Sequence, residues 1–125
     1  MASILVVDDS TLSTRTLVEA LRRSGYDVEI APDADEAVRL FKLNPVDAVV
    51  MDCHVEASSQ TIAPVLRQIY PDTPIIMMSG YCGVPCKRLR AADGCVQKGD
   101  TTALLDALRT LLCSRHYGLC QSVAA

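Results

Sequence analysis

The chain has 125 residues and half of them are hydrophobic, which is enough for the core of one compact domain. Its 15 acidic residues outnumber 12 basic ones, so no basic surface for nucleic acid stands out and direct DNA binding is not expected. No apolar stretch reaches the ~20 residues of a membrane-spanning helix, and no basic residue precedes Arg15 as in a signal peptide, so we expect a cytoplasmic protein without membrane contact.

The first part of the chain predicts two strand–helix pairs. Residues 4–7 are apolar without alternation, as in a central strand of a parallel sheet that helices cover on both faces. A stretch of helical period follows and ends at Gly25. Residues 27–30 alternate polar and apolar side chains, which predicts a less buried edge strand. Asp33, with Glu36 three residues later, is typical of the capping box that starts a helix.

The middle of the chain repeats this pattern. Two more uninterrupted apolar runs, 48–51 and 75–78, predict further central strands. Between them, apolar residues recur at helical spacing over 62–69 and enclose Pro64, which a helix accepts only in its first turn. The third helix is therefore expected to start late, near Thr61.

The last part predicts a weak helix, an edge strand and a strong helix. Segment 86–92 has a single large apolar residue, so we expect the fourth helix to be short. Residues 95–96 form a short apolar run typical of an edge strand, and Asp100 introduces a leucine-rich final helix. We expect residues 1–113 to form one domain and residues 114–125 to be a tail without an output domain.

Six cysteines are present, and without a secretory signal we expect reduced thiols. Their spacings lack the paired short intervals of well-attested zinc sites. Neither a disulfide framework nor a zinc site is therefore expected.

Polar side chains stand at the ends of four predicted strands. Asp8 and Asp9 end the first strand, Asp52 the third, Ser79 the fourth and Lys98 the fifth. Taken singly, each is typical of a helix cap, a turn residue or a solvated charge. The carboxyl ends of parallel strands meet at one edge of the sheet, however, and ligands gather there. The combination therefore favours a functional site.

The residue types at this edge indicate phosphoryl chemistry with a metal. Three carboxylates repel one another, and a hard divalent cation relieves that repulsion. Mg²⁺ fits because it prefers oxygen ligands and commonly binds one or two carboxylates together with a phosphate. The lysine and the serine can donate hydrogen bonds to phosphoryl oxygens.

In four motifs the sequence resembles the receiver domain of bacterial two-component response regulators: the acidic pair of VVDDS, the aspartate of VDAVVMD, the serine of IIMMSG and the lysine of GCVQKGD. The resemblance implies a doubly wound α/β fold of the flavodoxin type, with a five-stranded parallel sheet in the order 2-1-3-4-5. It further implies a stand-alone module that catalyses only its own phosphorylation and dephosphorylation. Its partners would be a histidine kinase or histidine phosphotransfer protein and an unknown downstream protein.

The resemblance also implies a role for each residue. Asp52 would accept the phosphoryl group, Lys98 would contact it, and Ser79 would hydrogen-bond it and report its presence. His54 and Tyr81 would flank the path of attacking water and influence the phosphoryl lifetime. The implied Mg²⁺ ligands are oxygen atoms at the carboxyl ends of strands: Asp8, Asp9, Asp52 and the backbone carbonyl of His54.

Three departures from the family have consequences. Gly99 follows Lys98 where the family has a proline in a cis bond, so we expect a trans bond, since a non-proline cis peptide costs roughly 3 kcal/mol. Cys95 stands where the family has a switching aromatic residue, and a thiol is too small to act by bulk. The loop after Asp52 lacks the usual methionine-proline turn and is expected to be remodelled.

Three other functions compete with this interpretation. A degenerate receiver that serves as a phosphorylation-independent interaction module is the main alternative, although the complete set of site residues argues against it. A phosphatase with an aspartyl nucleophile commonly needs a second acid where His54 stands. A flavodoxin-like cofactor binder would need a phosphate-binding loop where the chain has acidic DDSTLS.

Overall fold

A computed structural model describes residues 2–8, 11–52, 62–79 and 93–115. The expected helix at 86–92 lies outside these residues. Among the described helices, none combines the length and the hydropathy needed to cross a membrane. The elements follow in the order β1 (Ser3–Val7), α1 (Thr11–Arg23), β2 (Asp27–Ala31), α2 (Ala34–Leu43), β3 (Ala48–Asp52), α4 (Ile62–Ile69), β4 (Ile75–Ser79), β5 (Gly94–Gln97) and α5 (Thr101–Arg115).

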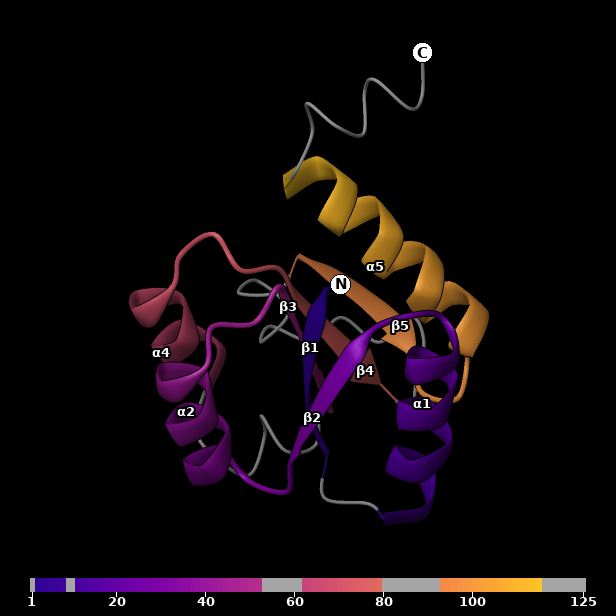
Figure 1. Ribbon diagram of the computed structural model, residues 1–125, viewed down its shortest axis with the longest axis horizontal. Coiled ribbons are helices and arrows are strands. Elements are labelled where there is room, and N and C mark those ends of the chain that lie inside the picture. Colours follow the sequence, from indigo (N-terminus) through magenta and orange to yellow (C-terminus); the bar gives the residue numbers. More distant parts are fainter. Residues whose placement is uncertain (1, 9–10, 53–61, 80–92, 116–125) are drawn as a thin grey trace.

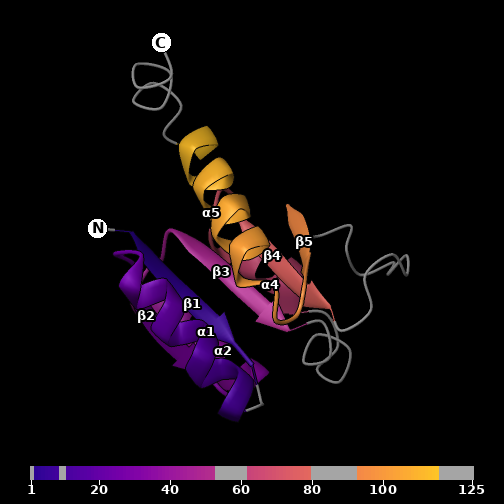
Figure 2. The ribbon, with the colours of Figure 1, turned by 90° about the vertical axis from the view of Figure 1, so that its right-hand side faces the viewer.

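The strands form one parallel sheet in the order β2-β1-β3-β4-β5, which confirms the expected topology. Figure 2 shows this order across the sheet. In the centre, Ile4 of β1 lies opposite Ala48 of β3. Toward the edge, Met78 of β4 lies opposite both Asp52 of β3 and Val96 of β5. Because every pair is parallel, all five strands end at the same edge.

Helices cover both faces of the sheet, as the doubly wound fold requires (Figure 1). α2 and α4 pack on one face, and α1 and α5 pack on the other. The central strands β1 and β3 are therefore buried on both sides, which confirms the reading of the uninterrupted apolar runs.

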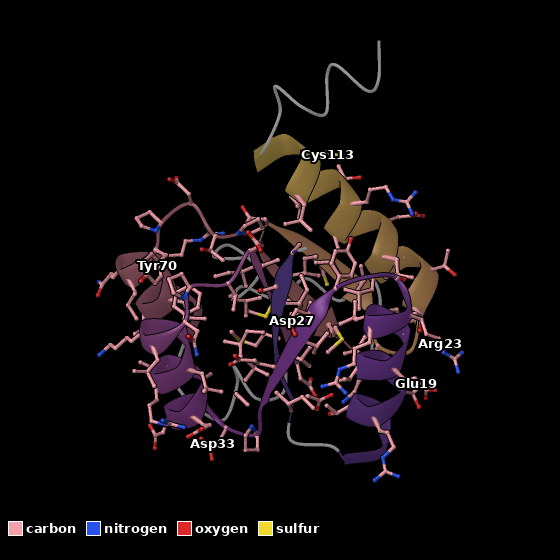
Figure 3. All side chains as sticks on the ribbon, in the orientation of Figure 1. Glu19, Arg23, Asp27, Asp33, Tyr70 and Cys113 are labelled. Atoms are coloured by element: carbon pink, nitrogen blue, oxygen red, sulfur yellow. The ribbon has the colours of Figure 1, made fainter. Side chains whose placement is uncertain are left out.

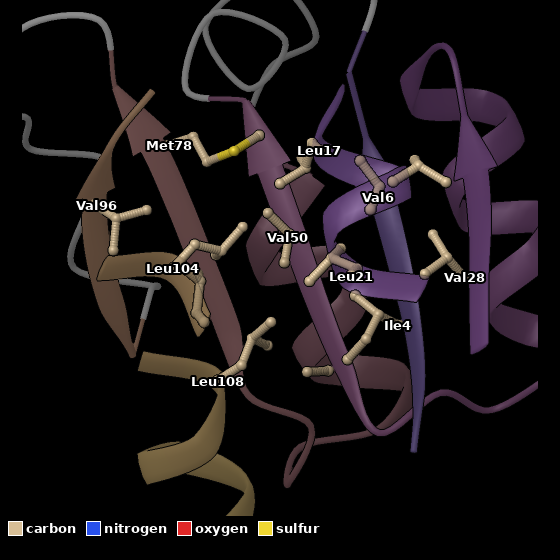
Figure 4. Packing of buried hydrophobic residues seen from close by; sticks show 13 residues of the cluster. Ile4, Val6, Leu17, Leu21, Val28, Val50, Met78, Val96, Leu104 and Leu108 are labelled. Carbon is tan, nitrogen blue, oxygen red and sulfur yellow. The ribbon is translucent and has the colours of Figure 1, made fainter. Parts of the chain in front are cut away.

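Alternate strand residues point to opposite faces and create two hydrophobic clusters. Under α2 and α4, Phe41 and Leu66 are fully buried, and the Phe41 ring meets the edge of the Tyr70 ring at a centroid distance of 5.2 Å. Under α1 and α5, Leu21 and Leu108 pack onto the other side of the same strands (Figure 4). Each methylene group buried in this way contributes about 0.8 kcal/mol.

Local signals fix several helix ends where the sequence predicted them. After α1, the N–H of Gly25 donates to the carbonyl of Arg22 and the N–H of Tyr26 donates to that of Leu21, with Gly25 at φ +95°. This pattern is a Schellman motif. At the start of α2 (Figure 3), the Asp33 side chain accepts a hydrogen bond of 2.9 Å from the N–H of Glu36. The Glu36 carboxylate instead pairs with Arg39, so the capping box is only half formed.

α4 begins at Ile62, which confirms that Pro64 falls in the first helical turn. Three large apolar side chains of the described helices and strands are nevertheless exposed: Val65 of α4 by 42%, Ile30 of β2 by 43% and Leu43, the last residue of α2, by 62%. The buried face of the short α4 is centred on Leu66, and among the described strands β2 is an edge strand with β1 as its one neighbour.

Cys113 of α5 is disulfide-bonded, so the expectation of reduced thiols is wrong for this residue. That expectation rested on the compartment expected for the chain as a whole. It does not exclude a bond between two thiols that the fold brings within reach.

Candidate functional site

Two buried carboxylates lie side by side at the carboxyl edge of the sheet. Asp8 directly follows β1, and Asp52 is the last residue of β3, the strand next to β1. Asp8 is 3% exposed and Asp52 is 4% exposed. Burial of charge at this level is costly unless a counter-charge is close. A positively charged group close to Asp8 and Asp52 is therefore needed to stabilise the two carboxylates.

Lys98 supplies this positive charge, and it comes from the end of the strand on the other side of β4. It follows β5, and its Nζ donates a hydrogen bond of 2.7 Å to Oδ2 of Asp52. The same Nζ lies 3.6 Å from Oδ1 of Asp8. The structure thus brings together three of the residues that the sequence singled out. Two carboxylates and one ammonium leave this trio with an excess negative charge.

The surroundings of Lys98 act on its pKa in opposite directions. Burial alone lowers the pKa of the Lys98 ammonium, because it disfavours the charged form. The hydrogen bond to Asp52 and the negative charges of Asp52 and Asp8 raise it and prevail, so the pKa of Lys98 lies above its ordinary value. The ammonium is therefore charged at neutral pH.

A tight turn carries Lys98 to the carboxylates. The N–H of Asp100 donates to the carbonyl of Gln97 at 3.0 Å, which closes a four-residue turn. Gly99, the third residue of this turn, has φ +94°, a value that glycine adopts without steric cost. The described residues contain no cis peptide bond, so the expected trans bond after Lys98 is confirmed. Asp100 also caps α5 by accepting a hydrogen bond from the N–H of Ala103.

We predict that Gly99→Ala lowers the free energy of unfolding by about 1 kcal/mol, because alanine must adopt a left-handed conformation there. An added Cβ would meet no atom within 4 Å, so the loss is conformational and not steric. Gly94→Ala in β5 is the matched control, since its Cβ would make an ordinary 3.9 Å contact with Leu111. Urea denaturation measures both variants, and equal losses would contradict the explanation.

A cleft of about 300 Å³ opens beside Lys98, between α1 and the turn before α5. No pattern in the sequence predicts this cleft, because the apolar residues that line it have the spacing of ordinary core residues. Thr16 of α1 lines it next to Asp8, and its apolar wall belongs to the cluster shown in Figure 4: Leu17, Met78, Val96 and Leu104. Lys98 is therefore accessible from this side.

The other predicted site residues are only partly described. Asp9, His54 and Tyr81 lie outside the described residues. Ser79 is the last residue of β4 and lies opposite Gln97, so its backbone is at the site edge. Cys95 lies in β5 opposite Met77 and is exposed.

The described carboxylates fit a Mg²⁺ site. Asp8 and Asp52 offer the oxygen ligands that Mg²⁺ prefers, and the negative excess over Lys98 favours a divalent cation. Within the described ranges, no group of three or more His, Cys, Asp or Glu side chains could hold a metal. A pair of carboxylates nevertheless suffices for Mg²⁺, which commonly keeps several waters.

Comparisons with known sequences agree with this geometry. The response regulator receiver domain model matches residues 4–109, a range that includes Asp8, Asp52 and Lys98. The acid tolerance regulatory protein ActR of Sinorhizobium medicae is 31% identical over 111 residues, which cover 85% of this chain and 57% of ActR. The chain thus spans little more than half the length of this relative.

Solved structures share the fold. A CheY-like receiver domain protein from Methanospirillum hungatei superimposes with a TM-score of 0.84 at 24% identity, over 94% of this chain and 98% of that one. The response regulator TrrA of Thermotoga maritima, solved in complex with Mg²⁺ and BeF, gives a TM-score of 0.80 at 29% identity. That alignment covers 89% of this chain and 99% of TrrA.

Proposed function

This chain belongs to the response regulator receiver domain family, and we propose that it accepts a phosphoryl group on Asp52 in a Mg²⁺-dependent reaction. Receiver domains are signalling modules of two-component systems that interact with histidine kinases or phosphotransfer proteins. The observation that carries the proposal is the 2.7 Å hydrogen bond from Lys98 to Asp52, beside Asp8.

Asp52 is the proposed nucleophile. One of its carboxylate oxygens attacks phosphorus, the bond from phosphorus to the leaving group breaks, and that group departs with the bonding electrons. The product is an acyl phosphate on Asp52. Burial at the end of β3 restricts the approach to the open edge of the sheet and limits the access of water.

Lys98 is proposed to exchange partners during this reaction. In the resting site its ammonium neutralises the Asp52 carboxylate. As the new bond forms, the charge on Asp52 falls and negative charge resides on the phosphoryl oxygens, which accept the same N–H donors. We propose the Ser79 hydroxyl, at the end of β4, as a second donor to these oxygens.

The carboxylates of Asp8 and Asp52 outnumber the single ammonium of Lys98, and this excess negative charge supports the proposal that a metal ion binds at the same edge of the sheet. When bound, Mg²⁺ offsets the charge of the transferring phosphoryl group. The proposed ligands extend the described pair by two residues: Asp8, Asp9, Asp52 and the backbone carbonyl of His54.

Output through contacts with an unknown downstream protein is also part of the proposal. Cys95 replaces a large switching side chain on β5, so any conformational change must use other residues. The division into a domain at 1–113 and a tail at 114–125 stays a prediction.

Incubation with Mg²⁺ and a small phosphodonor tests the proposal. We expect intact-mass spectrometry to show the gain of one phosphoryl group, its loss after hydroxylamine treatment, and no gain when EDTA removes the metal. Hydroxylamine cleaves acyl phosphates and leaves phosphoserine intact. Failure to gain a phosphoryl group from any donor would favour the phosphorylation-independent interaction module.

A further inference from the structure

Asp93 links the starts of β4 and β5 at the edge of the sheet opposite to the site. Its backbone N–H donates to the carbonyl of Ile75 at 2.7 Å. Its Oδ2 accepts a hydrogen bond of 2.8 Å from the N–H of Ile75. The side chain thus supplies an acceptor at a point where the β5 ladder, which starts at Gly94, has not yet begun.

Arg67 of α4 forms a salt bridge with the same Asp93 carboxylate. Its Nη2 lies 2.5 Å from Oδ2 of Asp93, and its Nη1 donates to the carbonyl of Pro71 at 3.2 Å. The two side chains are 29% and 34% exposed, so solvent screens this pair less than it screens a fully exposed one. One Asp93 oxygen therefore joins α4, the start of β4 and the start of β5.

The register of β5 decides whether Lys98 reaches the site. β5 has four residues and, of the strands that the structure describes, pairs only with β4, from Ile76 opposite Gly94 to Ser79 opposite Gln97. A slip by one residue would move Lys98 by about 3.3 Å and turn its side chain to the other face. Either change would break the 2.7 Å hydrogen bond to Asp52.

We propose that Asp93 and Arg67 are positioning residues, which hold β5 in the register that brings Lys98 to Asp52. They act from the amino ends of the strands, about 16 Å of extended chain from Lys98, and touch no reacting atom. They also fix α4, the first described helix after Asp52, relative to the strand that precedes Lys98. The kinetic consequence rests on the proposed function, whereas the structural consequence for Lys98 does not.

A double-mutant cycle separates positioning from general stability. We expect Asp93→Ala to slow phosphoryl uptake by about 10-fold or more, because small misplacements of a catalytic group cost that much. In a Lys98→Ala background the same substitution should change the rate by less than about twofold, since nothing remains to be positioned. An equal slowing in both backgrounds would overturn the proposal.

Two further variants refine this cycle. Asp93→Asn keeps an oxygen acceptor for the Ile75 N–H and loses the charge that binds Arg67, so its rate should lie between those of wild type and Asp93→Ala. Arg39→Ala is the control, because it removes another arginine–carboxylate pair, with Glu36 of α2, far from β5. Its uptake rate should equal that of wild type, and a comparable slowing would overturn the assignment.

NMR provides a readout that needs no phosphorylation. The ¹⁵N shift of Lys98 Nζ and the amide signals of Lys98 and Gly99 should change in Asp93→Ala and stay unchanged in Arg39→Ala. Unchanged Lys98 signals in Asp93→Ala would overturn the inference even if wild type is phosphorylated. If wild type takes no phosphate but the Lys98 signals move, the proposed function fails and the positioning of Lys98 stands.

Discussion

Replacing Asp52 by asparagine is expected to abolish the Mg²⁺-dependent gain of a hydroxylamine-labile phosphoryl group. The amide is a far poorer nucleophile than the carboxylate, and the substitution also removes one of the two described acidic side chains proposed to bind the metal. Intact-mass spectrometry after incubation with a small phosphodonor measures this loss directly. The amide keeps nearly the same shape, so the buried end of β3 should stay folded.

Asp106→Asn is the matched control, because Asp106 is an exposed aspartate of α5. This variant should take up the phosphoryl group at the rate of wild type. Circular dichroism is the check that both variants are folded. A hydroxylamine-labile phosphate on Asp52→Asn would show that another carboxylate is the acceptor.

Lys98→Ala is expected to slow phosphoryl uptake by on the order of 100-fold, the usual effect of removing one preorganised donor from a developing negative charge. The same variant should bind Mg²⁺ more tightly, because the ammonium that now neutralises Asp52 at 2.7 Å would no longer compete with the metal. Quench-flow or time-resolved mass spectrometry gives the rate, and isothermal titration with Mg²⁺ gives the affinity.

A slower uptake together with a higher Mg²⁺ affinity indicates the loss of the Lys98 hydrogen-bond donor and not a general disruption of the site. A parallel fall of rate and Mg²⁺ affinity would mean that the substitution has merely collapsed the carboxylate pair. Lys42→Ala, at an exposed lysine in the last turn of α2, should change neither quantity.

The pattern of the sequence was sufficient for the gathering of Asp8, Asp52 and Lys98 at one edge of the sheet. Uninterrupted apolar runs identify strands that are buried on both faces, and the residue after such a run necessarily lies at the carboxyl edge. The family resemblance then supplied the order of the strands, which places Lys98 two strands away from Asp52. The roles of these residues stay predictions.

Other features depend on contacts between distant segments, which periodicity does not encode. Arg67 and Asp93 are 26 positions apart, and each looks like a solvated charge in the sequence. The expectation about the bond after Lys98 was correct, but the turn that replaces a cis-proline is defined by the φ of Gly99. Val65 belongs to the apolar period of α4 but is exposed, because the period of a short helix does not define which of its apolar side chains face the sheet.

β1 and β3 are inner strands that come early in the chain, whereas β5 is an edge strand that comes last, so the chain order sets the order in which the site is completed during synthesis. Every pairing is parallel and spans a crossover, so no two strands can associate as a local hairpin. Once the ribosome has released β3, its pairing with β1 brings two like charges together. The neutralising ammonium is translated almost fifty residues later. Before β5 docks, the two carboxylates repel each other, and the ammonium of Lys98 reduces this repulsion, so docking of β5 is driven by charge as well as by burial.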